Sequence, residues 1–136
     1  MAMYSGSYQG RYPMDSTNPT LVGSMQLLSN ILPSATVLYC YGDRRPGAHP
    51  EPDFRKLTTN NISYSYVPTL KWPDTPDSTL MADRVYATSA GSRWPQDGNH
   101  KGLGGNILFN DGHVSWLNEL PSALKDKNGK QVVLSP

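Results

Sequence analysis

Three residues of this sequence have the type and proximity to support chemistry: His100, Asp111 and His113, with Asp97 shortly upstream. Imidazole and carboxylate groups are common ligands of divalent ions, so three of them in one place could hold a metal. Asp111 and His113 can point the same way across a turn, but an extended chain from His100 to Asp111 spans roughly 30 Å. The spacing therefore favours Asp111 as a turn former and the histidines as polar residues beside strands.

The element that must position these residues is a β-hairpin. The apolar run Ile107 to Phe109 and the alternating run His113 to Leu117 lie on either side of Asn110-Asp111-Gly112. Asp-Gly between two such runs is a strong hairpin signal, because both residues tolerate the positive φ of a tight turn. We predict two short strands joined at this turn.

Other catalytic patterns are missing from the sequence. Gly102-Leu-Gly-Gly105 precedes a strand and lacks the Lys-Ser/Thr of a phosphate-binding loop, so its glycines are expected to let the backbone pass close beneath another element. We find no Gly-x-Ser-x-Gly elbow, no Cys-His pair at a recognisable spacing and no pair of acids suited to general acid and base catalysis. We therefore expect a protein that is not an enzyme and binds no cofactor.

The composition indicates one loop-rich domain over residues 1–136, because Gly and Pro each contribute twelve residues. The formal charge of +1, without a block of like charge, argues against nucleic acid or an anionic membrane as the main partner. No window approaches a membrane span and the first residues do not resemble a signal peptide. Cys40, the one cysteine, excludes an internal disulfide and is expected to be a buried small hydrophobe in a strand.

Periodicity predicts helices near the start of the chain. Thr20 to Leu32 carries an apolar stripe, Asn18 or Thr20 can cap its start, and Pro33 ends it. One or two further helical turns are expected between residues 1 and 9, where Gly6 argues against a longer helix. The stripe residues are Leu21, Met25, Leu28 and Leu32 in the first helix and Tyr4, Tyr8 and Tyr12 around the second.

Four further segments complete the predicted fold. We expect a buried strand over 35–41, a half-buried strand over 62–67, a strand over 78–85 and an edge strand over 131–134. A helical turn is expected over 118–125. Trp72 and Trp94 lie in loops. The predicted fold class is therefore α+β, with short N-terminal helices packed on a small antiparallel sheet that ends in a C-terminal β-hairpin.

The hairpin region also resembles a known family. The residues His100, Gly104, Gly105, Asn106, Asp111, Gly112 and His113, with the apolar run before the turn and Trp116 after it, resemble the C-terminal signature of prepilin-type processing-associated proteins, which are pseudopilin-like. In that signature a His is followed, after a spacer, by Asp-Gly. The spacer here, Lys101 to Asn110, has ten residues, one more than is usual in the family. Weaker similarity upstream extends the resemblance over most of residues 3 to 118.

The resemblance implies a pilin- or pseudopilin-like head and a non-catalytic structural subunit of a type II secretion or type IV pilus-like system. It places the protein in the cell envelope, on the periplasmic or cell-surface side. Members begin with a leader and an apolar helix that this sequence lacks, so the chain resembles the globular head alone. Its low net charge and scattered aromatic residues lead us to expect a monomer for the isolated head. Membrane attachment and contacts with other pilin-like subunits or secretion proteins would then depend on that helix.

One alternative from another functional class remains open. It is a secreted ligand- or metal-binding module that uses His100, Asp111 and His113, or the loops that carry Trp72 and Trp94, as its contact surface. Divalent-ion calorimetry would discriminate the two interpretations.

Overall fold

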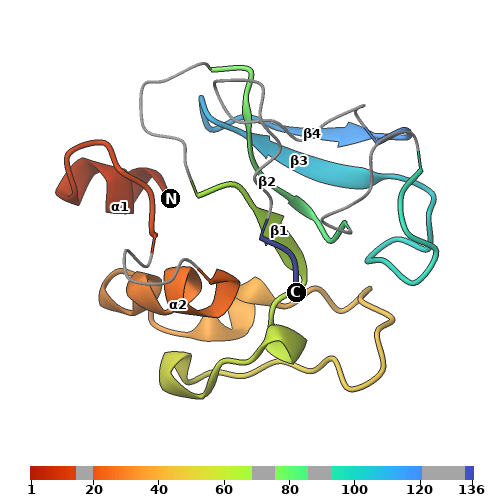
Figure 1. The fold of residues 1–136 in the computed structure, drawn as a ribbon, viewed down its shortest axis with the longest axis horizontal. Helices are drawn as coiled ribbons and strands as arrows, with labels where there is room; N and C mark the ends of the chain where they lie inside the picture. The colour runs from red at the N-terminus through yellow and green to blue at the C-terminus, as the bar shows by residue number, and fades with distance from the viewer. Residues whose placement is uncertain (15–19, 69–75, 86–92, 121–133) are drawn as a thin grey trace.

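The computed structural model describes residues 1–14, 20–68, 76–85, 93–120 and 134–136. In these residues the fold is α+β, with two short α-helices beside a four-stranded antiparallel sheet (Figure 1). The helices are α1 (Ala2–Ser7) and α2 (Leu21–Gln26), and the strands are β1 (Tyr64–Tyr66), β2 (Thr79–Asp83), β3 (Gly105–Phe109) and β4 (Val114–Leu117). Short 3₁₀ helices cover Leu27–Asn30, Ala35–Leu38, Phe54–Lys56 and Thr59–Asn61.

The strands follow each other in sequence order, β1-β2-β3-β4, and each pairs antiparallel with the next. The predicted hairpin is confirmed as β3 and β4. The Phe109 N–H donates to the His113 carbonyl and the Gly112 N–H to the Phe109 carbonyl, at 2.9 Å each. Gly112 has a φ of 93°, the left-handed conformation that closes a three-residue hairpin loop.

Cross-strand pairing assigns the side chains to two faces of the sheet. One face includes Met81 and Leu108, which pack with the helices and with Tyr66. The opposite face includes Ala82 and Ile107, which pack in a second cluster with Val85, Trp94 and Leu120. We call the first the helix face and the second the loop face. The sheet therefore has a hydrophobic cluster on each side.

The predicted helices are confirmed, with shorter bounds. The Thr20 side chain caps α2 by accepting a hydrogen bond from the Gly23 N–H at 3.0 Å. After Gln26 the chain tightens into a 3₁₀ turn that ends at Asn30, before the predicted end at Leu32. Three of the four stripe residues, Leu21, Met25 and Leu28, are buried, as the pattern predicted.

The strand predicted over 35–41 is wrong, because Ala35–Leu38 forms a 3₁₀ helix. The Ser34 hydroxyl accepts a hydrogen bond from the Thr36 N–H and so caps the turn. Ala35 and Leu38, three residues apart, face the core while Val37 is exposed, which is the period of a 3₁₀ helix rather than of a strand. Cys40 consequently lies after a helix rather than in a strand, and is only partly buried.

The half-buried strand predicted over 62–67 is also corrected, because β1 is buried on both faces. The Ser65 side chain lies on the loop face, as does its cross-strand partner Ala82. Its hydroxyl donates to the Val85 carbonyl at 3.2 Å and accepts from the Val85 N–H at 3.0 Å. Hydrogen bonds of this kind allow a serine to be buried. Alternation of serine and tyrosine therefore did not indicate solvent on the serine side.

Part of the C-terminal prediction can be assessed. Leu134 pairs with Tyr66 in an antiparallel bridge, with backbone hydrogen bonds of 2.8 and 2.9 Å, so it covers the outer edge of β1. Residues 131–133, most of the helical turn predicted over 118–125, and Trp72 lie outside the described residues.

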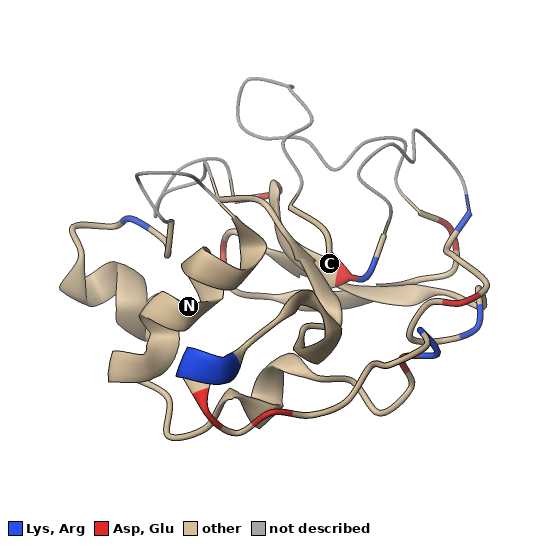
Figure 2. Cartoon of the chain, turned by 60° about the horizontal axis from the view of Figure 1, so that its bottom comes forward, with Lys and Arg blue, Asp and Glu red and all other residues tan. Residues whose placement is uncertain are grey.

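Acidic segments lie next to basic ones along the described chain rather than on separate faces (Figure 2). Three charged side chains of the described residues are buried: Asp43, Asp83 and Arg84. Among the described helices, none has the length and apolar character that a membrane crossing requires.

Candidate functional site

The carboxylate of Asp83, at the end of β2, contacts several residues in and just before the predicted motif. Asp83 is only 3% exposed. Its Oδ1 accepts from Asn99 Nδ2 at 2.6 Å, and its Oδ2 accepts from Asn106 N at 2.6 Å and Asn106 Nδ2 at 3.1 Å. His100 Nε2 lies 3.1 Å from the same Oδ2. We call Asp83, Asn99, His100 and Asn106 the Asp83 cluster.

His100 lies against the helix face of the sheet, where it contacts Asp83. Its ring also meets the Trp116 ring edge to face, with centroids 4.9 Å apart. Asn106 and Trp116 are cross-strand partners, and Asp83 is the partner of Tyr64. His100, the first residue of the motif, therefore contacts Trp116 of the hairpin and the Asp83 carboxylate of β2. These contacts tie the loop before β3 to the sheet.

Asp111 and His113 form a separate pair at the hairpin turn. Asp111 Oδ1 accepts from the His113 N–H at 3.0 Å and lies 2.5 Å from His113 Nδ1. The backbone hydrogen bond from His113 is the largest of the causes that lower the pKa of Asp111, so the turn holds a carboxylate. The His113 ring stacks on Phe109 at a centroid distance of 4.3 Å. These contacts stabilise the turn.

The three candidate metal ligands are thus not brought together. His100 is bonded to Asp83, whose carboxylate also binds Asn106. Asp111 comes five residues after Asn106, which is roughly 17 Å in an extended strand. Within the described residues, no group of three potential ligands could hold a metal ion. The third histidine, His49, is bonded through Nδ1 to the Gly47 carbonyl at 2.8 Å.

The two adjacent motif glycines lie beneath two aromatic rings. A Cβ on Gly104 would come within 2.5 Å of the Trp116 ring, and a Cβ on Gly105 within 2.5 Å of the Trp94 ring. The predicted close passage of the backbone is therefore confirmed, with one tryptophan packed over each glycine. Trp94 is only 4% exposed, which removes it from the contact surface of the proposed binding module.

A buried ion-pair network supports the loop that precedes the motif. Arg45 bonds the Asp43 carboxylate through Nε and Nη2, with a shortest distance of 2.7 Å. Arg84 Nη2 bonds the Asp97 carbonyl at 2.5 Å, and its Nε lies 4.0 Å from Asp43. Burial alone would raise the pKa of Asp43, but hydrogen bonds from Arg45 and Ser63 and the Arg45 charge together lower it.

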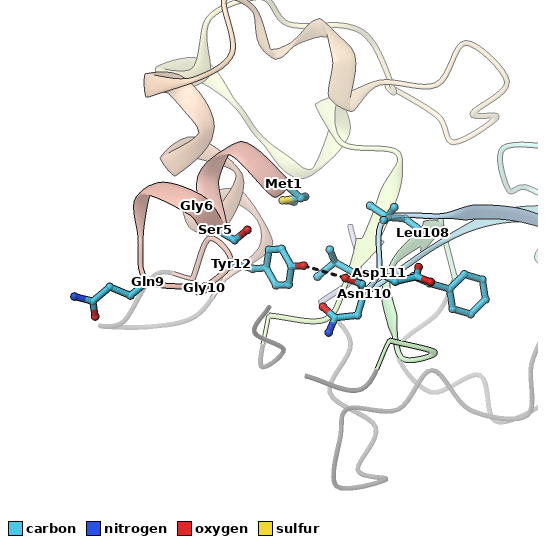
Figure 3. Close-up of a pocket in the computed structure, with 12 residues that line it drawn as sticks. Met1, Ser5, Gly6, Gln9, Gly10, Tyr12, Leu108, Asn110 and Asp111 are labelled. Atoms are coloured by element: carbon cyan, nitrogen blue, oxygen red, sulfur yellow. Dashed lines mark hydrogen bonds between the residues drawn. The ribbon is translucent and has the colours of Figure 1, made fainter. Parts of the chain in front are cut away.

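A solvent-open cleft lies between α1 and the hairpin turn (Figure 3). Its volume is about 640 Å³, a size typical of small-molecule sites. The Tyr12 hydroxyl donates to the Asn110 carbonyl at 3.2 Å and so closes one side of the cleft. Leu108 contributes apolar surface and Asp111 a carboxylate to its lining. We call this space the α1 cleft.

A second, shallower space runs along the helix face. This apolar groove has a volume of about 280 Å³ and is lined mainly by hydrophobic side chains from Met1, from residues in and near the 3₁₀ helices, and from the sheet. Tyr64, Asp83 and Asn106 border it. Burial is the first cause that raises the pKa of Tyr64, to about 12, ahead of the nearby Cys40 and Asp83. Its other lining residues include Met1, Leu28, Leu32, Val37, Met81, Leu108 and Val114.

Comparison with known proteins gives no match. No family model matches the chain, no curated protein matches its sequence, and no solved structure matches it.

The residues that hold the motif in place were not predicted from the sequence. Asp83 was placed in a strand, but its role depends on Asn99, His100 and Asn106, which come from another part of the chain. The sequence did contain one signal, because the charged pair Asp83-Arg84 directly follows an apolar run. In the structure both of these side chains are buried. Charged residues are rarely buried unless paired, so such a position predicts internal partners.

Proposed function

We propose that this chain is the globular head of a pseudopilin-like structural subunit of a type II secretion or type IV pilus-like system in the cell envelope. The observation that carries the proposal is the use of the motif residues as scaffold. His100 bonds Asp83, Asp111 and Gly112 form the hairpin turn, and Gly104 and Gly105 pack beneath tryptophans. A sequence signature whose residues stabilise the fold is what we expect of a subunit that acts through its surfaces.

The surroundings of the histidines favour a structural role over a catalytic one. General acid and base catalysis needs a base bonded to a nucleophile or poised in a cleft. In the described part of the chain, His100 and His113 face carboxylates and His49 a carbonyl, and none is bonded to a hydroxyl or to the Cys40 thiol. Asp111, the carboxylate in the α1 cleft, is engaged with His113.

The longer spacer is compatible with the signature. Lys101 and Gly102 have positive φ values of 56° and 75°, and the Leu103 N–H donates to the His100 carbonyl at 3.1 Å. An additional residue can therefore be taken up in this turn without moving His100 away from Asp83.

The apolar groove supports the second part of the proposal, an N-terminal helix in the full-length protein. Met1 lines both the groove and the α1 cleft, and Figure 1 shows the N-terminal end of α1 directed towards the sheet. A helix continued upstream of α1 would enter the groove and cover Leu108. That helix would also provide the membrane attachment and the contacts with other pilin-like subunits.

The test is expression of the natural reading frame, including its upstream sequence, in a bacterium with a functional prepilin peptidase. We expect an apolar segment upstream, cleavage at its leader in mass spectra of the protein, and cross-links to pilin-like subunits in the envelope. A strain with an inactive peptidase is the control. An uncleaved protein that is the same in both strains would contradict the proposal.

A ligand-binding module is the second candidate, favoured by the α1 cleft alone. Its volume and mixed lining fit a small, mostly apolar molecule. A fragment screen followed by NMR would support it through specific shifts at Tyr12 and Asn110. Fragments that shift only scattered exposed residues would argue against it.

A further inference from the structure

The two outer edges of the sheet differ. The outer edge of β1 is covered by Leu134, which pairs with Tyr66. β4 forms the opposite edge, and no described residue pairs with its outer side. An unpaired edge exposes N–H and C=O groups that can bind another strand.

The register of the hairpin shows which backbone groups are exposed. Phe109 and His113 form a hydrogen-bonded pair, and the pairing continues without a shift through Leu108–Val114 and Asn106–Trp116. Hydrogen-bonded and non-hydrogen-bonded pairs alternate in an antiparallel ladder. The N–H and C=O groups of Val114 and Trp116 therefore point away from β3, along the free edge.

The side chains at this edge are unusually apolar. Val114 is 60% exposed and Trp116 46% exposed, and both lie on the helix face, where Val114 borders the apolar groove. Natural edge strands are usually protected by lysine, proline, a bulge or a very short length. Val114–Leu117 has no charged residue or proline, and its pairing with β3 has no register shift.

We infer that the edge of β4 binds an extended peptide segment of a partner protein, which adds to the sheet as a fifth, antiparallel strand. Backbone hydrogen bonds to Val114 and Trp116 would supply affinity, and apolar side chains at alternate positions of the segment would pack beside them. This inference does not depend on the proposed secretion role.

The charges around the edge specify the segment further. The centre of β4 is neutral, which selects an uncharged centre in the partner. Glu119 is exposed just beyond the C-terminal end of β4, whereas Asp111, at the other end, is already paired with His113. In antiparallel addition, the N-terminal end of the segment lies beside Glu119, so a lysine or arginine is expected there.

A designed peptide tests the inference on the full 136-residue chain. The probe is Lys-Val-Thr-Val-Thr-Val, acetylated and amidated to remove its terminal charges. We expect saturable binding that slows amide hydrogen exchange at Val114 and Trp116 by about tenfold or more. A peptide with proline at its central valine should not bind, and one with glutamate in place of lysine should bind more weakly.

Two variants separate edge binding from other contacts. Val114→Pro removes an outward N–H, which an edge strand tolerates, and Val114→Lys adds a protecting charge. Both should abolish binding while circular dichroism shows a folded protein, and Tyr41→Lys, at an exposed aromatic outside the edge, should bind as the parent does.

Unchanged binding by both Val114 variants would overturn the inference, as would protection confined to other residues. Protection of Val114 and Trp116 that grows with protein concentration in the absence of peptide would also overturn it, because the occupant would then be a second copy of the chain.

Discussion

His100 Nε2 lies 3.1 Å from Oδ2 of the buried Asp83, so the first residue of the hairpin motif is anchored to a different strand of the sheet. This contact joins two segments that the sequence separates by a long loop. It also gives a structural role to a histidine that precedes the hairpin at a distance.

Removal of the Asp83 carboxylate should therefore lower the stability of the fold. In Asp83→Ala, the buried donors of Asn99 and Asn106 lose their acceptor, and the free energy of unfolding is expected to fall by about 2 to 4 kcal/mol. His100→Ala should cost about 1 to 2 kcal/mol, because it removes one partner. Urea unfolding followed by circular dichroism measures both values.

The other motif histidine provides the matched control. His113 and Asp111 form an exposed pair, so His113→Ala should change the stability by less than about 1 kcal/mol. An equal loss in the two histidine variants would show that the Asp83 cluster is not the anchor.

The glycine beneath Trp94 should not accept a side chain. In Gly105→Ala, the added Cβ would overlap the Trp94 ring, and we expect a loss of about 1 to 3 kcal/mol in the free energy of unfolding. Gly6, in α1, has no heavy atom within 4 Å of its Cβ position, so Gly6→Ala should instead stabilise the protein by about 0.5 to 1 kcal/mol.

A double-mutant cycle identifies the cause of the Gly105→Ala loss. Truncation of Trp94 to leucine is expected to reduce the added cost of Gly105→Ala, since the ring no longer occupies the space. An unchanged cost would indicate that backbone conformation, rather than the tryptophan, selects glycine here.

Asp43 should make the protein sensitive to acid. Its pKa in the folded state is lowered from the usual value of 3.8, so the stabilisation it provides is fully present above that value. The stabilisation is lost as the pH falls through the lowered pKa. Urea midpoints measured from about pH 6 down to about pH 2 should therefore fall less steeply in Asp43→Asn than in the parent protein.

Glu119, whose side chain is exposed, supplies the control for this series. Glu119→Gln should keep the acid dependence of the parent. At neutral pH, Asp43→Ala is expected to cost about 3 to 5 kcal/mol, because it leaves buried arginine charge without this partner. Parallel acid profiles for Asp43→Asn and the parent would contradict the assignment.

The Tyr12 hydroxyl should hold α1 against the hairpin. It reaches the carbonyl of Asn110, 98 residues away in the sequence, so Tyr12→Phe removes a long-range link worth about 1 kcal/mol. Amide exchange across residues 2–7 should accelerate, whereas exchange in β3 should not. Uniform acceleration throughout the chain would mean that the bond supports global stability only.

Local turn chemistry made the hairpin predictable. The turn at Asn110-Asp111-Gly112 is determined by its own residues. Gly112 adopts the positive φ, and the Asp111 side chain accepts a hydrogen bond from the His113 N–H. The α2 cap at Thr20 was readable for the same reason. Residues 35–41 were misassigned because β-branched and aromatic composition reflects burial against neighbours, while the cap at Ser34 decided the backbone.

The contacts of the candidate site could not be predicted in the same way. Asp83 meets Asn99 only because β2 and the loop before β3 converge in three dimensions, and a single sequence contains no record of that pairing. The burial of Trp94 depends likewise on its packing over Gly105, which composition does not reveal.

The bridge between Leu134 and Tyr66 has a consequence for how the molecule assembles. The neighbouring hydroxyls of Ser65 and Ser135, 3.0 Å apart, join positions separated by 70 residues. Closing so large a loop costs chain entropy before the contact between its ends is formed, and such steps slow folding. The hairpin, whose contacts are local in sequence, is thus expected to form before the Leu134–Tyr66 bridge. Until that bridge closes, the outer edge of β1 stays open to pairing with another chain.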